Sequence, residues 1–149
     1  MHTRVLKISL LTLSFLGIAD AWYLADAALN KVALSCNIAA LDGCNIVAQS
    51  PYSKLFGLPL ALYGVVFYAV IFALAALLFV LPTRIVFRSL YVLGIAGVVA
   101  SVCFLSIQFF LIHAVCMYCI ASAAIAVLIW LIARSLTRSR SFARVAAET

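Results

Sequence analysis

The sequence has little charge, few acidic residues and almost no histidine. Of its 149 residues only 9% are charged, with four Asp or Glu and two His, whereas 68% are hydrophobic. Soluble domains are about half apolar and about a quarter charged, so a soluble domain of this size is excluded. The mean hydropathy of +1.28 indicates an integral membrane protein. Since little remains for a soluble extension, we expect one transmembrane domain over residues 1–149.

The formal net charge of +6 is not distributed as a nucleic-acid-binding surface would be. The basic residues lie at the ends of apolar runs, where Lys and Arg set the orientation of membrane helices. We therefore expect membrane lipid around the protein and no nucleic-acid partner.

Four apolar runs, at about 8–28, 57–81, 90–112 and 114–133, are each near the roughly 20 residues that a helix needs to cross the hydrocarbon. Backbone groups in lipid must be hydrogen-bonded within the protein, so these runs are predicted to be helices. The expected fold class is all-α, an integral membrane bundle of four transmembrane helices. The last two runs are separated by little more than His113, which predicts a tight turn there.

The positions of Lys and Arg predict the topology. Eight of the ten fall on one side of the membrane and only Lys31 and Lys54 on the other. The positive-inside rule puts the basic side, with both termini, in the cytoplasm. The loop at about 30–56 and the turn at His113 then face the extracytoplasmic side. The alternative is a cleaved signal peptide in the first run, which would leave three spans.

Five cysteines carry the most reactive side chains of the chain. Cys36 and Cys44 lie in the extracytoplasmic loop, and Cys116 and Cys119 follow the extracytoplasmic turn. Paired cysteines in an oxidising compartment usually form disulfides, so the loop pair taken alone favours a structural bridge. Cys103, within the third run, is expected to act as a small buried hydrophobic residue.

The Cys116-Met-Tyr-Cys119 motif favours redox chemistry over a structural bridge. Residues three apart on a helix have Cβ atoms about 5–6 Å apart, whereas a relaxed disulfide needs about 3.5–4.5 Å. The first cysteine is therefore expected at a frayed helix start, and a bridge there is expected to be labile. A helix N-terminus also stabilises thiolate, and we expect Cys119, just inside the helix, to gain most.

Three polar residues near the spans have more than one interpretation. Asp20 either faces the bundle interior as part of a proton path or lies near the outer interface, because a carboxylate at mid-bilayer costs roughly 2.5–3.5 kcal/mol. Gln108 is expected to form a hydrogen bond between helices, and contact with a ligand is the alternative. His113 is interfacial, a proton donor near a redox centre, or a metal ligand together with the cysteines.

Several motifs together give the chain a family resemblance. They are "LGIADAWYL" in the first run, "CNIAALDGCNIVAQSPYSKLFGLPLALYG" in the loop and second run, and "CMYC" before the fourth. With these motifs the chain resembles bacterial members of the vitamin K epoxide reductase family, membrane thiol oxidoreductases that help form disulfides in the periplasm. The resemblance covers nearly the whole chain.

The resemblance implies a catalytic role for each of four cysteines. Cys36 and Cys44 would be the shuttle pair, with Cys36 exchanging with a thioredoxin-like partner and Cys44 relaying to Cys116. Cys119 would be the cysteine that meets a quinone, ubiquinone or menaquinone.

The resemblance also implies contacts to the quinone. Ser50 matches the family's loop serine, and the segment from Ser50 to Phe56 would form a short helix that caps the quinone pocket. The animal enzymes place an Asn and a Tyr around the quinone head group, at positions that here hold Leu60 and Ala123. Because both residues are apolar, the sequence argues against vitamin K epoxide chemistry.

The implied setting is the bacterial cytoplasmic (inner) membrane, with the active site on its extracytoplasmic face. Since many bacterial relatives carry a fused thioredoxin-like domain and this sequence ends soon after its fourth run, we expect a separate periplasmic, DsbA-like partner. The alternative function is a membrane metal-binding or metal-transport protein that uses the cysteines and His113. The seven-residue spacing of the loop pair is unusual for a metal site, and no metal site is expected.

Overall fold

The computed structural model describes residues 2–36 and 43–148, with side chains within 3–36 and 43–138. Its four long helices are α1 (His2–Asn30), α3 (Leu60–Val80), α4 (Arg84–Ile107) and α5 (Met117–Glu148). A π-helical turn, η3, continues α4 to Ile112. Each long helix is long and apolar enough to span a membrane. The predicted fold class, an all-α membrane bundle of four spanning helices, is confirmed.

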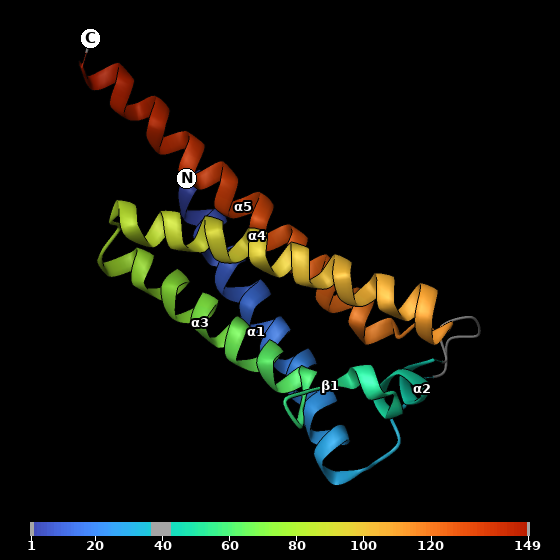
Figure 1. Cartoon of the computed structure of the whole chain (residues 1–149). Coiled ribbons are helices and arrows are strands. Elements are labelled where there is room, and N and C mark those ends of the chain that lie inside the picture. The colour runs from blue at the N-terminus through green and yellow to red at the C-terminus, as the bar shows by residue number, and fades with distance from the viewer. Residues whose placement is uncertain (1, 37–42, 149) are drawn as a thin grey trace.

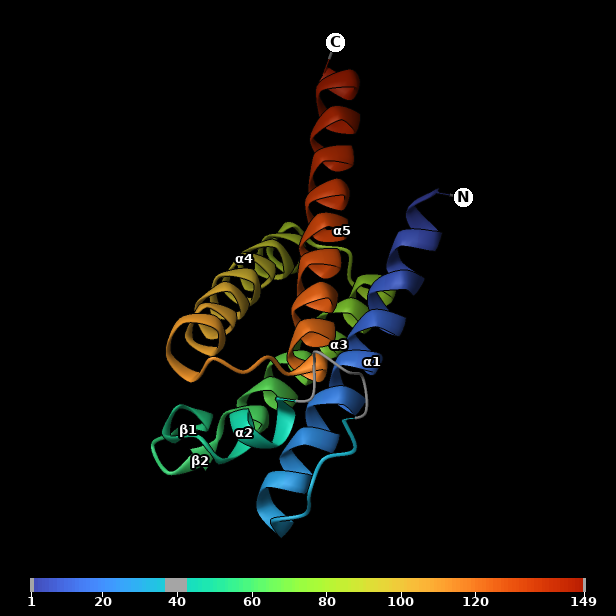
Figure 2. The same cartoon turned by 90° about the vertical axis from the view of Figure 1, so that its right-hand side faces the viewer.

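The bundle has two different ends (Figure 1). The labelled chain ends lie at one end, and the short helix α2 (Cys44–Gln49), the 3₁₀ turn η2 (Pro51–Ser53) and the hairpin of β1 (Lys54–Leu55) and β2 (Leu58–Pro59) lie at the other. The view turned by 90° shows the same separation, with α2 and the hairpin beside the lower part of α1 and far from the labelled chain ends (Figure 2). We call these the terminal end and the loop end.

The second span begins later than the sequence suggested. Gly57 was expected to start a helix, but it forms the turn of the β1–β2 hairpin, in which Leu55 pairs with Leu58. Phe56 and Gly57 have φ of 50° and 84°, and positive φ at both central residues is what a two-residue type I′ turn requires. The hydroxyl of Tyr63 donates a hydrogen bond to the carbonyl of Leu55 at 3.0 Å and ties the hairpin to the first turn of α3.

The last two spans also differ from their predicted bounds. The third begins at Arg84 rather than near residue 90. Long arginine side chains at a helix end can extend to the membrane surface, so Arg84 and Arg88 can belong to the helix itself rather than to the connector before it. The fourth begins at Met117 rather than at 114. His113 has φ of 54°, a left-handed conformation that ends η3, and an irregular segment joins it to α5.

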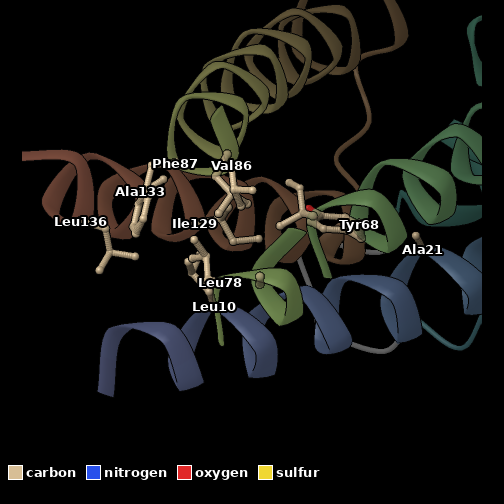
Figure 3. Close-up of a cluster of buried hydrophobic side chains, with 12 residues drawn as sticks. Leu10, Ala21, Tyr68, Leu78, Val86, Phe87, Ile129, Ala133 and Leu136 are labelled. Carbon is tan, nitrogen blue, oxygen red and sulfur yellow. The ribbon is translucent and has the colours of Figure 1, made fainter. Parts of the chain in front are cut away.

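The core of the terminal end is made mainly of aliphatic side chains from all four long helices, with the aromatic rings of Phe87 and Tyr68 among them (Figure 3). Leu10, Leu78, Leu90 and Ile129 are at most 1% exposed. Small residues let the helices approach. A Cβ at Gly94 would lie 3.0 Å from Cα of Trp130, which brings α4 against α5, as small residues do at helix contacts in membranes.

Candidate functional site

The loop end buries four of the five cysteines in one apolar cluster. Cys36 and Cys44 are joined by a disulfide, while Cys116 and Cys119 are free thiols. The cluster buries Cys36, Cys44 and Cys116, and Cys119 packs against them from the first turn of α5. Two cysteine pairs that are more than 70 residues apart in sequence are thus neighbours, one oxidised and one reduced.

Cys116 is the N-terminal cap of α5. Its carbonyl accepts the first hydrogen bond of the helix, from the N–H of Ile120 at 3.1 Å. Its own N–H donates to Oε1 of Gln108 at 3.0 Å, and Gln108 is fully buried. The expectation that the first cysteine of the motif stands at a helix start is confirmed. Gln108, on the continuation of α4, thus bonds to the N-cap residue of α5, and its side chain also interacts with the thiol of Cys119 on α5, as expected of a hydrogen bond between helices.

The capping position favours the thiolate of Cys116. The pKa of the Cys116 thiol is lowered to about 7, mainly because the Cys119 thiol donates a hydrogen bond to it, with further N–H donors from Cys119 and Tyr118. These two N–H groups belong to the second and third helical residues, the usual donors to an N-cap side chain. The expectation that Cys119 would gain most from the helix start is wrong, because the donors at the helix start point toward Cys116.

Tyrosine side chains hold the chain that precedes Cys36 against two long helices. The N–H of Ser35 donates to the hydroxyl of Tyr23 on α1 at 3.3 Å, and the hydroxyl of Tyr118 on α5 donates to the carbonyl of Ser35 at 3.1 Å. The two rings are in contact, with centroids 5.1 Å apart. Since Tyr118 lies between Cys116 and Cys119, this contact connects the two cysteine pairs directly.

The other side of the loop disulfide is held equally closely. Asn45, next to Cys44, accepts the N–H of Leu34 at 2.8 Å and donates to its carbonyl at 3.1 Å. Gly43 packs on the segment before Cys116, where an added Cβ would lie 2.7 Å from the backbone nitrogen of Val115. Only glycine fits there, and the contact sets Cys44 beside the start of α5.

An apolar cavity of about 790 Å³ opens beside the cysteine cluster. That volume is within the range of small-molecule sites, which are mostly apolar with a few polar groups. Cys44, Cys116 and Cys119 form part of its wall at the loop end, and α1, α3 and α4 contribute mainly small and aromatic residues, among them Ala21, Gly64, Phe67, Tyr68, Ala96, Gly97, Ala100 and Phe104. The cavity therefore places free thiols next to a space suited to an apolar ligand.

The four residues expected near a quinone lie in different places. Leu60 lines the cavity. Ser50 ends α2, where its hydroxyl donates to the carbonyl of Val47 at 2.7 Å. Phe56 is 93% exposed at the tip of the hairpin, and Ala123 is buried on α5. These three are not among the cavity-lining residues that the structure describes.

Of the short helix expected over 50–56, the structure has the 3₁₀ turn η2 (Pro51–Ser53), whose residues line the cavity, while a longer helix precedes that segment. Helix α2 covers Cys44–Gln49, and Pro51 follows Ser50 in a separate 3₁₀ turn. The residue before a proline is disfavoured in the helical conformation, and Ser50 is extended, with ψ of 153°. Helix α2 still contributes to the cavity wall, through Cys44, Val47 and Ala48.

Cys103 differs from its predicted role. It is exposed rather than buried and lines the cavity from α4. In a membrane sequence, an apolar run does not distinguish a side chain in the packed core from one at a cavity wall. The position of Cys103 within such a run therefore predicted a core residue.

His113 is exposed on the turn before the motif. Within residues 2–36 and 43–148 no group of three or more His, Cys, Asp or Glu side chains is arranged to hold a metal ion. The residues proposed for the metal alternative are therefore not gathered into a ligand set in the described part of the chain.

A polar group of three helices was only partly visible in the sequence. Asp20 is half-buried within α1 and receives a hydrogen bond from the side chain of Ser122 on α5. Tyr68 on α3 binds the same serine. The sequence drew attention to Asp20 because a carboxylate is costly in a membrane span. Ser122 and Tyr68 gave no such signal, because hydroxyl groups are common in membrane helices.

A disulfide beside a free dithiol, both buried at the mouth of an apolar cavity in a membrane bundle, defines a membrane thiol–disulfide oxidoreductase. The sequence comparison agrees with that class. The chain belongs to the vitamin K epoxide reductase family, whose model matches residues 8–134, a range that holds all five cysteines and most of each of the four spans. No curated protein sequence matches the chain at significant similarity.

Proposed function

We propose that this protein reoxidises a periplasmic thioredoxin-fold, disulfide-forming protein and passes the two electrons to a membrane quinone. The observation that carries the proposal is the burial of both cysteine pairs in one cluster at the cavity mouth. The family is linked to quinones and thioredoxin-like partners in general, while the electron path below is specific to this chain.

In the first half of the cycle, a thiolate of the reduced partner attacks Cys36 and the Cys36–Cys44 bond breaks. The second partner thiol then resolves the mixed disulfide, so the partner leaves oxidised and the loop pair is reduced. The Cys36 side chain is only 5% exposed. The contacts of Ser35 with Tyr23 and Tyr118 must therefore open before the partner can reach Cys36.

In the second half, the reduced loop passes its electrons inward. The Cys44 thiolate attacks Cys116 of an oxidised Cys116–Cys119 pair and releases the Cys119 thiolate. Cys36 then attacks Cys44, which restores the loop disulfide and leaves both motif cysteines reduced. An oxidised loop pair beside a reduced motif pair, as found here, is the state from which electrons leave for the quinone.

The cavity supports a quinone as the acceptor. Its walls are apolar along α1, α3 and α4, while Tyr68, Ser122 and the motif thiols supply polar groups at the loop end. A bound quinone accepts two electrons and two protons and becomes a quinol. Leu60 would contact the quinone directly. Around the direct contacts would lie Ser50, Phe56 and Ala123.

The distribution of charge supports a location for this chemistry. Eight of the ten basic residues lie on the terminal side, which by the positive-inside rule supports a cytoplasmic position for that end, in a bacterial inner membrane. The loop end then faces the periplasm, where a soluble partner has access to Cys36.

The test uses the full chain in proteoliposomes with a short-chain ubiquinone or a menaquinone and a reduced thioredoxin-fold protein. Quinone absorbance is followed after mixing. Wild type is expected to reduce quinone, Cys119→Ala to lose that activity, and Cys44→Ala to accumulate a mixed disulfide through Cys36. Ser106→Ala, a change on the exposed face of α4, serves as control. Partner oxidation that proceeds equally without quinone would contradict the proposal.

A further inference from the structure

A carboxylate lies inside the bundle with one oxygen unpaired. Oδ2 of Asp20 is buried and has no hydrogen-bond partner among the residues that the structure describes. A carboxyl group at this depth costs roughly 2.5–3.5 kcal/mol on insertion scales, and buried polar groups normally have a partner. Asp20 is therefore a costly feature that the cysteine chemistry described above does not explain.

Asp20 belongs to a continuous chain of hydrogen bonds across three helices. The Ser122 side chain on α5 hydrogen-bonds to the carboxyl group of Asp20. The Ser122 hydroxyl also lies 2.9 Å from the Tyr68 hydroxyl, and Tyr68 donates to the Ser122 carbonyl at 2.7 Å. A proton can pass along such a chain by rotation of the two hydroxyl groups.

The packing of α1 on α3 places the tyrosine in this chain. An added Cβ at Gly17 would lie 2.5 Å from Cδ1 of Tyr68, and one at Gly64 would lie 3.3 Å from Cβ of Ala21. These glycines let the two helices approach closely enough for the Tyr68 ring to cross the face of α1. Tyr68 is 2% exposed, and its hydroxyl reaches α5.

The hydrogen-bond chain starts next to the reactive thiols and ends at the cavity. Ser122 is three residues after Cys119, so both side chains lie on one face of α5. Cys119, Ser122 and Tyr68 all line the cavity, and Asp20 lies behind them, outside the described lining residues. This arrangement leaves the carboxylate connected to the cavity only through hydroxyl groups.

We propose that Asp20, Ser122 and Tyr68 form a proton relay between the Cys119 thiol and an acceptor oxygen in the cavity, an inference that rests on the proposed function. When the motif pair is oxidised, the Cys116 thiolate and the Cys119 thiol form a disulfide, and two electrons pass to the quinone. The quinone takes up two protons: the one that Cys119 loses, through the relay, and the one that Cys116 gave up when it ionised, from solvent. Asp20 accepts the proton of Cys119 through the hydroxyl of Ser122. The hydroxyls of Ser122 and Tyr68 return a proton to the cavity, so that Asp20 is unchanged at the end of the cycle.

The first test needs no quinone. Infrared difference spectra are recorded while the cysteines of the purified full chain are reduced by a dithiol and reoxidised. Without quinone there is no acceptor in the cavity, so the proton stays on Asp20 when the motif pair is oxidised. A carboxyl C=O band that appears on oxidation and vanishes on reduction is therefore expected in wild type, absent in Asp20→Asn and retained in Asp26→Asn. Asp26 is the matched control, because it lies on the same helix, is exposed and accepts a hydrogen bond from Asn30.

The second test separates the two halves of the reaction in proteoliposomes with ubiquinone. Asp20→Asn keeps the side-chain volume and the acceptor for Ser122 but cannot take up a proton. We expect kcat for quinone reduction to fall by about tenfold or more, as the loss of a general base does, with little change in KM for quinone. Single-turnover exchange of the loop disulfide with the partner should stay within about twofold of wild type.

Tyr68→Phe and Ser122→Ala interrupt the same chain and should produce the same split between the two half-reactions. Asp20→Glu, which restores a carboxyl group, should recover a substantial part of kcat, whereas a purely structural role would favour Asn over the larger Glu.

The outcomes distinguish the relay from the function on which it rests. An infrared band that survives in Asp20→Asn, or a wild-type rate of quinone reduction in that variant, would overturn the relay alone. A wild-type protein that exchanges thiols with the partner but never reduces quinone would overturn the proposed function and the relay with it. An equal loss of both half-reactions in Asp20→Asn would assign Asp20 a structural role and also overturn the relay.

Discussion

At the terminal end of the bundle, Leu10, Leu78 and Ile129 fill the space between helices with aliphatic carbon. At the loop end, the same four helices surround a disulfide, two thiols, the amide of Gln108 and a cavity. The first region is packed mainly with apolar side chains, apart from Lys7, which donates to the carbonyl of Leu78, and Ser14, which is buried within α1. The second region contains the buried Gln108 and the cavity. The comparison indicates that stability and reactivity are carried by different ends of the same helices.

This division has a physical reason in membranes. Lipid tails are as apolar as leucine side chains, so helix association depends on close packing and hydrogen bonds rather than on exclusion of water. The terminal end supplies the packing. The loop end can then keep a cavity and unpaired polar groups that would destabilise a bundle lacking such support.

The largest expected effect comes from closing the space at Gly43. Gly43→Val places side-chain atoms against the backbone of Val115, where even a Cβ would lie 2.7 Å from the nitrogen. Cys44 should move away from the start of α5, and quinone reduction should fall by about a hundredfold, since small displacements of reacting groups are costly. The measurement is turnover in proteoliposomes. Gly57→Asn, at an open turn position that asparagine tolerates, is the control and should retain activity.

The next effect concerns the terminal end and should affect stability alone. Ile129→Ala removes a fully buried side chain and should cost about 2–5 kcal/mol of unfolding free energy. Leu131 lies two residues further along α5 and is exposed. Leu131→Ala should therefore cost much less. Thermal unfolding in detergent measures the difference. If turnover per folded molecule dropped in Ile129→Ala as sharply as stability, the division between the two ends would be wrong.

The third effect is a pH dependence of stability in the reduced protein. The pKa of Cys116 is about 7 in the folded protein against an ordinary value of 9.0, so folding favours its thiolate. The resulting stabilisation is fully present above about pH 9 and is lost as the pH falls through about 7. Unfolding midpoints measured from pH 6 to 9 should therefore rise more in wild type than in Cys116→Ser. Cys103→Ser should retain the wild-type slope, and identical slopes in both variants would exclude Cys116 as the source.

The smallest effect is expected from the contact that connects the two cysteine pairs. Tyr118→Phe removes the hydrogen bond to the Ser35 carbonyl, worth about 0.5–1.5 kcal/mol. The loop should open up to about tenfold more often, and a small dithiol should reduce the Cys36–Cys44 bond faster by the same factor. Tyr91→Phe on α4 is the matched control. Equal reduction rates in wild type and Tyr118→Phe would show that this contact does not hold the loop.

The spans and the cysteine pairs could be predicted from sequence because they depend on local properties. Apolar runs of sufficient length become helices in lipid, and the spacing of Cys116 and Cys119 placed the first of them at a helix start. The reversed order of thiolate stabilisation could not be predicted, because it depends on which of these residues caps α5. That boundary differed by three residues from the expected one.

Contacts between segments that are distant in the chain could not be predicted from the sequence either. Ser122 and Tyr68 are 54 residues apart, and nothing local marks either as a partner of Asp20. The left-handed conformation of His113 and the turn at Phe56 likewise depend on how neighbouring helices meet, which hydrophobicity does not encode. Membrane sequences hide such contacts more than soluble ones, because lipid-facing and core-facing residues are equally apolar.

The burial of Cys116 has a consequence for the lifetime of the protein. A thiol with a pKa of about 7 has a substantial thiolate fraction near neutral pH, and thiolates that solvent can reach are the ones that peroxides convert to sulfenic and then irreversibly to sulfinic acid. Cys116 is only 1% exposed. The loop that covers it keeps the reactive sulfur away from dissolved oxidants, so the residue most vulnerable to oxidative damage by its chemistry is sheltered from it by its position.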